Sequence, residues 1–194
     1  MGAIESGAKK KRRRKDLRNA VLATIGIAGV LAVAAVAPNV VQLLKVTGAT
    51  DRLRYRAMTV LGRLKAKGEI EFIEREGKRY ARLTPRGKEL LAFYREKLRL
   101  QEEKPRRWDQ RYRLVMFDIP EKRKRTRDQL RLTMREIGFL RLQDSAWVYP
   151  YDCEEFVALL KAHLHIGKDV LYAVIEEIEN DAVIRTHFHL PAKS

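Results

Sequence analysis

The chain has 194 residues, of which 45% are hydrophobic, and this length suits one or two domains with ordinary cores. A formal net charge of +16 and a pI near 10.2 indicate a polyanionic partner. Added salt would weaken the binding of such a partner. The single cysteine, Cys153, excludes an internal disulfide framework and a zinc cluster of the familiar Cys/His spacing. These features agree with a reducing compartment, and we expect a cytoplasmic protein.

Residues 1–16 contain the cluster KKKRRRK at positions 9–15. We expect a basic tail that is disordered when free, because such a run of like charges has no core to pack against. The tail suits contacts with DNA phosphates, and it equally suits a solvated or localisation-type segment. The remaining chain is basic without it, so the tail alone does not account for the polyanion partner.

An uncharged stretch at 20–37 follows the basic tail. Its length and its basic flank would suit a membrane anchor. Its alanine and glycine content makes transfer into lipid marginal, and we therefore interpret it as the buried first helix of a DNA-binding domain. Membrane attachment and a dimerisation helix are the alternatives. Pro38 then opens a second expected helix over 38–45.

The periodicity of the next segment predicts an amphipathic helix, which Thr50 or Asp51 can cap and Gly68 ends. One stripe of this helix is apolar and the other is rich in cations, so one side can pack while the other contacts phosphate. The apolar stripe consists of Leu53, Ala57, Val60, Leu61 and Leu64, and the polar stripe of Arg52, Arg56, Thr59, Arg63 and Lys67.

A short two-stranded wing is predicted after Gly68, with Gly77 at its turn. Thr84 and Pro85 then supply a cap and a first-turn proline for a helix from Pro85 to about Leu100. We expect the packing side of that helix to consist of Leu90, Leu91, Tyr94 and Leu98.

Helix, glycine stop and wing together resemble the second half of a winged helix-turn-helix, expected here over residues 17–100. A solvated charged helix beside a hairpin is the alternative. The expected DNA-binding residues are Arg52, Arg54, Arg56, Thr59, Arg63, Lys67, Arg75, Lys78 and Arg79.

A polar segment at 101–111, containing Pro105, predicts a linker to a second domain at 112–190. In that domain we expect strands at 112–120, within 139–150, at 169–178 and at 183–190, with helices at 121–137 and 153–165 and a break near Gln143 and Asp144. The order β-α-β-β-α-β is that of a ferredoxin-like sandwich, so the whole chain is predicted to be α+β. One sheet face of such a sandwich is left uncovered, and a homodimer would bury it.

The expected 121–137 helix combines a core side of Leu130, Met134 and Ile137 with a dense basic surface. That surface consists of Lys122, Arg123, Lys124, Arg125, Arg127 and Arg131.

Residues 108–152 resemble the central domain of PaaX-type transcriptional repressors, which is itself similar to the small CRISPR-associated adaptation nuclease. The resemblance lies in FDIP at 117–120, Arg127 to Leu130, Gly138-Phe139 and S-x-W-x-Y-P at 145–150. It extends over roughly 108–190, and the preceding winged helix matches the family's order of domains. It implies a dimeric, sequence-specific repressor.

PaaX-type repressors usually carry a further C-terminal region. Because this chain ends soon after the last expected strand, a response to an acyl-CoA-type effector is not expected. No other effector ligand and no operator sequence can be named from the sequence.

Asp118 carries the competing enzyme hypothesis. In the CRISPR-associated nuclease an acid at the end of the first strand meets its symmetry mate and holds a divalent ion, and Asp118 matches that position. Mg²⁺ or Mn²⁺ would suit such oxygen ligands. One carboxylate per subunit makes a thin site, however, and an aspartate after a strand is commonly a turn former or helix cap. We therefore favour a regulator that is not an enzyme and has no cofactor.

Other residues of chemical interest are interpreted as structural. Ser145 has no histidine nearby in sequence to activate it, and we expect it to satisfy backbone groups at a strand bend. His187 and His189 would share one face of the last strand, at the surface or in an interface rather than in a metal site. Trp147 and Tyr149 alternate on a strand and are expected to fill the packing layer rather than stack on bases.

Overall fold

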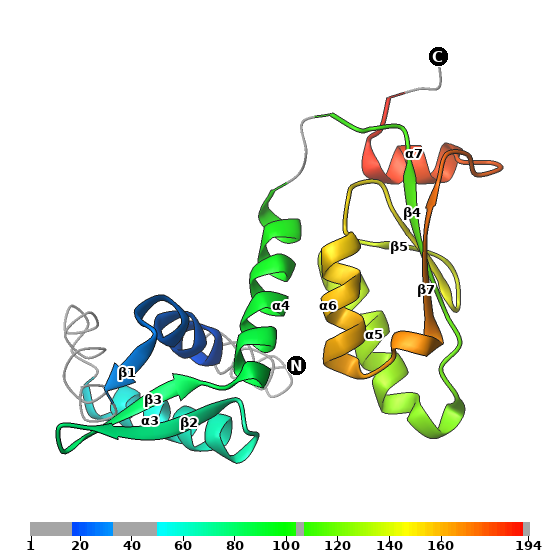
Figure 1. The fold of residues 1–194 in the computed structure, drawn as a ribbon. Coiled ribbons are helices and arrows are strands. Elements are labelled where there is room, and N and C mark those ends of the chain that lie inside the picture. The colour runs from blue at the N-terminus through cyan, green and yellow to red at the C-terminus, as the bar shows by residue number, and fades with distance from the viewer. Residues whose placement is uncertain (1–16, 33–49, 104–106, 192–194) are drawn as a thin grey trace, which may run out of the picture. The chain divides into compact units, whose positions relative to one another are not determined.

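The computed structural model describes residues 17–32, 50–103 and 107–191, and for 30–32 and 50–54 it describes the backbone only. The chain is α+β, with two antiparallel sheets (Figure 1). Contacts divide it into two units, Met1–Ala92 and Phe93–Ser194, and the division falls inside helix α4 (Pro85–Glu102). The basic tail at 1–16, the expected helix at 38–45 and residues 104–106 of the expected linker lie outside the described residues.

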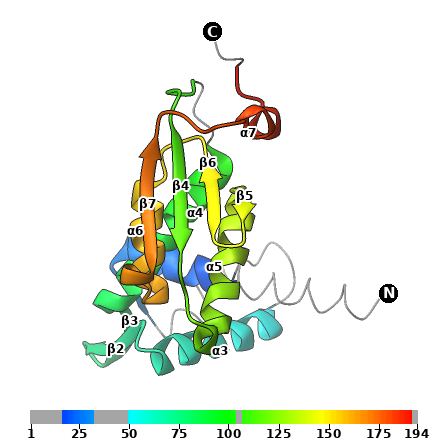
Figure 2. The same ribbon diagram turned by 90° about the vertical axis from the view of Figure 1, so that its right-hand side faces the viewer.

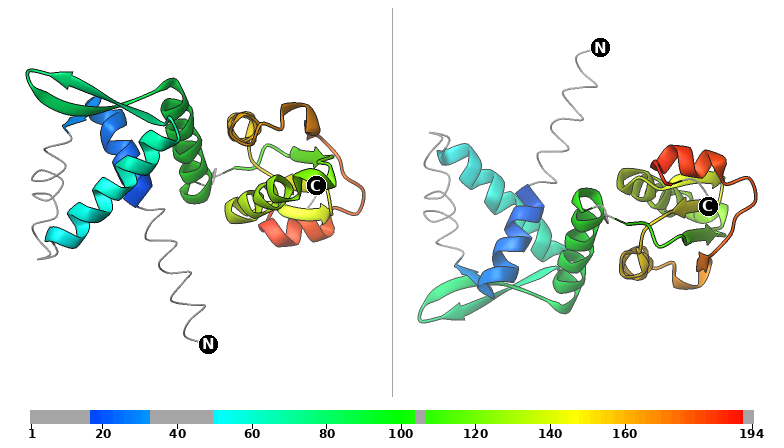
Figure 3. Two further views of the ribbon diagram at one scale, coloured as in Figure 1. Left: turned by 90° about the horizontal axis from the view of Figure 1, so that it is seen from below. Right: turned by 90° about the horizontal axis from the view of Figure 1, so that it is seen from above.

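In the N-terminal unit, a helix over 17–28 precedes β1 (Val30–Ala32), α3 (Thr50–Ala66), β2 (Ile70–Arg75) and β3 (Lys78–Leu83). The three strands form one sheet in the order β1-β3-β2. In both views of Figure 3 the helix over 17–28 crosses α3. The first half of α4 completes this unit.

The expected single helix over 20–37 is wrong at residues 29–32, and its last part, 33–37, lies outside the described residues. Gly29 has a φ of +74°, a left-handed conformation that breaks the helix. Val30 then pairs with Arg82, and Ala32 pairs with Tyr80, so the apolar stretch continues as the third strand of the wing sheet. Within the described residues, no helix is both long enough and apolar enough to cross a membrane.

The core of the N-terminal unit joins its helices to the sheet. Leu22, Ile25, Leu61, Leu64 and Ile70 are all fully buried. Each buried side chain of this size contributes roughly 1.5–3 kcal/mol to folding. These residues therefore fix the apolar side of α3 and leave its opposite side to solvent.

Thr84 fastens the start of α4 to the turn that follows α3. Its hydroxyl donates to the Gly68 carbonyl at 2.6 Å and accepts from the Gly87 N–H at 3.1 Å, which confirms the predicted helix cap. A Cβ at Gly87 would lie 1.9 Å from the Glu69 carbonyl oxygen. Only glycine fits this close approach, which holds the first turn of α4 against the residue that precedes the wing.

In the C-terminal unit, four strands lie side by side in the order β5-β6-β4-β7, and Figure 2 shows α5 and α6 on one face of this sheet. The elements are β4 (Tyr112–Phe117), a 3-10 turn (Glu121–Arg123), α5 (Lys124–Ile137), β5 (Leu140–Gln143), β6 (Ala146–Tyr149), α6 (Glu154–Leu164), a second 3-10 turn (Gly167–Asp169) and β7 (Val170–Ile175). Every neighbouring pair is antiparallel. The predicted β-α-β-β-α-β order is thus observed, as expected for a ferredoxin-like sandwich.

The strand predicted at 183–190 is wrong, because these residues form helix α7 (Ala182–Phe188). Ile184 and Phe188 lie four residues apart and therefore share one side of this helix, where they pack with Tyr112 and Val148. His187 lies in α7 and His189 follows it in a left-handed conformation, so the two histidines do not alternate along a strand.

The sheet has one covered face and one face that is covered only in part. Val115, Phe117, Trp147 and Tyr149 pack with α5 and α6, as predicted for the two aromatic residues. Among the described residues, α7 covers one end of the opposite face. At the other end Met116 and Leu171 are direct cross-strand partners and remain 38% and 52% exposed.

Helix α4 begins at Pro85 as predicted, and Leu90 and Leu91 of its expected packing side are buried. Leu98 is 52% exposed, which corrects its expected place in the core. Phe93 and Leu100 instead join the buried cluster of the C-terminal unit, and Phe93 stacks on His163 with 4.6 Å between ring centroids.

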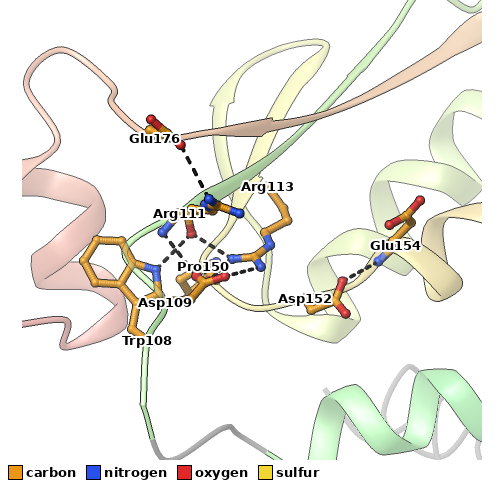
Figure 4. Close-up of polar contacts among 8 residues, drawn as sticks. All are labelled: Trp108, Asp109, Arg111, Arg113, Pro150, Asp152, Glu154 and Glu176. Carbon is orange, nitrogen blue, oxygen red and sulfur yellow. Dashed lines mark hydrogen bonds and ion pairs between the residues drawn. The ribbon is translucent and has the colours of Figure 1, made fainter.

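The segment that leads into β4 is held by a buried arginine (Figure 4). The Arg113 guanidinium donates to both carboxylate oxygens of Asp109 at 2.6 and 2.5 Å and to the Pro150 carbonyl at 3.0 Å. The hydrogen bond from Arg113 holds the pKa of the Asp109 carboxyl below its usual value. The Trp108 indole donates to the Arg111 carbonyl at 2.9 Å, so the whole turn before the sheet is ordered.

Cys153 lies in the core next to α6, and burial raises the pKa of its thiol to about 12, from an ordinary value of 9.0. The thiol therefore stays protonated in the folded chain while it ionises in the unfolded chain, and stability is lost as pH rises from 9 toward 12. We expect this group to lower the free energy of unfolding by roughly 2 kcal/mol between about pH 8 and about pH 10.5. Urea titrations of the protein and of Cys153→Ala at both pH values measure this, and an equal pH dependence in the two proteins would contradict it.

Candidate nucleic-acid interface

The candidate interface begins with α3, whose bounds agree with the predicted helix. Gly68 follows it with a φ of +67° and ends it, as expected. Ala57, Val60, Leu61 and Leu64 of the predicted apolar stripe are buried. The side chains of residues 50–54, which include the predicted Arg52, Leu53 and Arg54, lie outside the described residues.

The predicted cations of α3 are exposed wherever their side chains are described. Arg56, Arg63 and Lys67 are in contact with solvent, and none of them forms an ion pair within the described ranges 17–32, 50–103 and 107–191. At about 100° per residue these three fall on one flank of the helix. Their charge is therefore available to an external anion.

Thr59 differs from these cations, because its hydroxyl donates to the Tyr55 carbonyl at 2.8 Å within the same helix. Its proton is engaged, and its methyl group and oxygen lone pairs remain for a partner. Tyr55 itself is 75% exposed and Met58 is 43% exposed. These two residues were not singled out from the sequence, because charge was the feature considered there. At about 100° per residue Tyr55 stands opposite the buried Leu64, and Met58 lies about 60° to one side of Tyr55.

The wing turns tightly at Glu76 and Gly77, whose φ angles of 51° and 67° are both positive. Such a two-residue loop matches the right-handed twist of the two strands. Arg75 pairs with Lys78 across this turn, and Arg79 follows on β3. All three cations are exposed, so the hairpin tip carries the charge predicted for it.

Phe72 of β2 connects the wing with the end of α3. The ammonium of Lys65 lies 4.9 Å from its ring centroid and the guanidinium of Arg79 lies 5.8 Å from it. Cation–π contacts of this kind contribute about 0.5–1 kcal/mol at exposed sites. They hold Lys65 and Arg79 near the same ring, so the wing adjoins the flank of α3 that carries Lys65.

Asp118 lies just after β4 and is exposed. Its N–H donates to the Asp169 carbonyl at 2.9 Å, which brings a second acidic residue close in the main chain. The Asp169 carboxylate is occupied by Arg123 at 2.6 Å. No group of three or more His, Cys, Asp or Glu residues that could hold a metal ion occurs in the part of the chain that the structure describes.

Ser145 occupies the turn between β5 and β6, where its carbonyl accepts the Phe117 N–H at 3.0 Å. This bond is made by the main chain, so the expected role of the Ser145 side chain stays a prediction.

The predicted basic surface of α5 is partly neutralised within the chain. Arg123 contacts Asp169, Arg127 contacts Glu121 at 2.6 Å, and Arg131 donates to the Asp144 carbonyl at 2.9 Å. The exposed cations left on this surface are Lys122, Lys124 and Arg125, which form no ion pair with any described residue.

A family model described as the PaaX protein central Cas2-like domain matches residues 105–183. This segment is similar to the central domain of PaaX-type proteins. The PaaX-type domain contains β4 to β7 with α5 and α6, and the resemblance of FDIP and of S-x-W-x-Y-P to this family is confirmed over it. The match ends as α7 begins. No match to the chain was found among curated proteins.

Proposed function

We propose that the protein is a cytoplasmic transcriptional regulator, most simply a repressor, that binds a specific sequence in double-stranded DNA as a homodimer. One observation carries the proposal: six predicted DNA-binding cations, on α3, directly after it and on the wing, are exposed beside the buried side of α3. They are Arg56, Arg63, Lys67, Arg75, Lys78 and Arg79. The PaaX-type domain that follows supports a regulator.

The N-terminal unit suits a winged helix in its order of elements. Among the described elements, a first helix and a short strand precede a helix with an exposed basic flank and a hairpin, and the short strand joins the hairpin as its third strand. In this arrangement α3 enters the major groove and the wing contacts the phosphate backbone. A major groove about 12 Å wide accepts one helix, which requires the side of α3 opposite its core to be free.

The outer face of the PaaX-type sheet supplies a surface for pairing two chains. Beyond the part that α7 covers, Met116 and Leu171 oppose each other across β4 and β7, with half-buried Leu114 beside them. Exposed apolar groups gathered on one sheet face favour burial against a second copy. A twofold dimer would then present two copies of α3 to a palindromic operator.

Selection from a pool of random duplexes tests this function. We expect the full chain to enrich one palindromic sequence and to bind it at least about 10³-fold more tightly than random duplex at physiological salt. The affinity should fall steeply with salt, because phosphate contacts release counterions. Failure to enrich any sequence would reject the specific regulator.

The second candidate is a CRISPR-associated adaptation component or a metal-dependent nuclease. Its support is the exposed Asp118 at the end of β4, whose carboxylate forms no hydrogen bond or ion pair with the described residues. Two such carboxylates at a dimer interface would hold Mg²⁺ or Mn²⁺ and activate water. Mg²⁺-dependent cleavage of duplex DNA that Asp118→Asn abolishes, while binding remains, would establish it. Binding without cleavage favours the regulator.

A further inference from the structure

The side of α3 that lies opposite its buried stripe is not the side that carries its described cations. At about 100° per residue, Tyr55 stands opposite the buried Leu64, whereas Arg56 and Arg63 lie about a quarter turn to one side. Tyr55 and Met58 are 75% and 43% exposed. A helix that enters a groove with its core side away from the DNA therefore presents apolar groups to the bases first.

Thr59 adds a methyl group to this surface, which we call the apex of α3 and define as Tyr55, Met58 and Thr59. Because the Thr59 hydroxyl donates to the Tyr55 carbonyl at 2.8 Å, it has no proton left for a base. The apex therefore offers an aromatic ring, a thioether chain and a methyl group. Its remaining polar atoms are the Tyr55 hydroxyl and the lone pairs of the Thr59 oxygen.

Gly62 lies beside the apex, one turn beyond Thr59 and Met58. It is exposed, and a Cβ placed on it would meet no atom of the described chain within 4 Å. Glycine within a helix is less favourable than alanine, and here the described fold gains nothing from it. A missing side chain at this position lets another molecule approach the helix backbone closely.

The exposed cations border this surface. Arg56, Arg63 and Lys67 share one flank, and Lys65 lies on the other flank over the Phe72 ring. When a helix occupies a groove, its flanks face the two phosphate backbones while its outermost residues face the base edges. The charge distribution of α3 therefore separates phosphate contacts from base contacts.

We propose that α3 recognises the C5-methyl groups of thymine through Tyr55, Met58 and Thr59, while Arg56 and Arg63 hold phosphates. The C5-methyl group is the apolar feature that a thymine presents in the major groove, and apolar side chains are its usual partners. The inference rests on the proposed DNA-binding function and adds to it which residues determine specificity. It assigns the sequence preference to the apex rather than to the arginines.

The test uses the full chain and the duplex that it selects from a random pool. Each thymine is replaced in turn by deoxyuridine, which keeps the hydrogen-bonding edge and removes only the C5-methyl group. We expect at least one position per half-site at which the wild-type affinity falls about fourfold, the ratio that corresponds to one buried methyl-sized group. Tyr55→Ala should bind the thymine and deoxyuridine duplexes equally at the position that this side chain contacts.

Two further variants separate contact from folding. Tyr55→Phe keeps the ring and should keep the preference for thymine. Gly62→Ala should retain or raise the unfolding temperature, because alanine favours a helix, yet bind the selected duplex several-fold more weakly. If Gly62→Ala binds the selected duplex with unchanged affinity, the inferred close approach of DNA to the helix backbone is wrong.

The outcomes distinguish this inference from the function on which it rests. If the wild-type chain binds a selected duplex but responds to no deoxyuridine, or if Tyr55→Ala keeps the full thymine preference, the assignment of the apex is wrong and DNA binding stands. If the wild-type chain binds no duplex, the proposed function fails and the inference fails with it.

Discussion

Replacing Arg56 and Arg63 together by alanine is expected to lower the affinity for the selected duplex about 100-fold near 0.1 M salt. Each phosphate contact releases about 0.9 of a counterion, which corresponds to roughly tenfold in affinity per contact at this salt concentration. Because both residues are assigned to phosphates, affinity for random duplex should fall by the same factor. The slope of log affinity against log salt should become shallower by about two. Fluorescence anisotropy at a series of salt concentrations measures both quantities.

The matched control removes the same charge from the PaaX-type domain. Lys124 and Arg125 are exposed on α5 and form no ion pair with any described residue. We expect their double alanine variant to bind the selected duplex nearly as the wild type does. An equal or larger loss of affinity in this control would indicate that the principal DNA contact lies on the PaaX-type domain rather than on α3, as the second candidate function requires.

Replacing Leu171 by aspartate is expected to convert the dimer into a monomer and to weaken binding to a palindromic site by about 10²- to 10⁴-fold. Leu171 is 52% exposed and faces Met116 across the sheet, so the change leaves the covered core intact. It places a charge in the apolar surface proposed to contact the partner copy, where burial of an unpaired charge is costly. Affinity for a single half-site should stay unchanged, because α3 is unaltered. Sedimentation and duplex titrations measure the two effects.

Val183 provides the comparison for this variant. It is a large apolar residue of α7 and is 71% exposed. Val183→Asp therefore adds the same charge to the same unit, outside the proposed interface, and should remain dimeric. A dimeric Leu171→Asp would show that the chains pair elsewhere, and equal loss of dimer in both variants would point to a general effect of charge.

Local patterns were enough to predict much of the fold. The burial of Ala57, Leu61 and Leu64 follows directly from their spacing on a helix, and Gly68, Gly77 and Gly138 stand where a positive φ ends an element or turns a hairpin. The β-α-β-β-α-β order follows from the alternation of strand-forming and helix-forming segments. These features depend on neighbours in sequence, and so they can be inferred without coordinates.

The errors arise where distant residues decide the outcome. The 20–37 stretch has the composition of one helix, but its second part is drawn into a sheet by pairing of Val30 with Arg82. Polar and apolar residues alternate in the 183–190 stretch as they do in a strand. The stretch instead forms a helix, because as a helix it packs Ile184 against Tyr112 on the partly open sheet face. In both cases tertiary packing outweighs local preference.

The charged residues of the proposed interface were named from the sequence, whereas its apolar residues were not. Arg56 and Arg63 were found because cations at helical spacing are a direct sign of phosphate binding. Tyr55 and Met58 carry no such sign, since apolar residues in a helix are ordinarily assigned to the core. Only their exposure of 75% and 43% in the folded chain separates them from it.

Helix α7 gives the PaaX-type sheet an intramolecular cover at one end. Truncation before Ala182 would expose Tyr112 and Val148, which α7 covers. With Leu114 and Met116 they would form one continuous hydrophobic surface on the sheet. A small exposed apolar patch favours a closed dimer, whereas a fully exposed apolar sheet face favours aggregation. We therefore expect a chain that ends before Ala182 to aggregate more readily than the chain that contains α7.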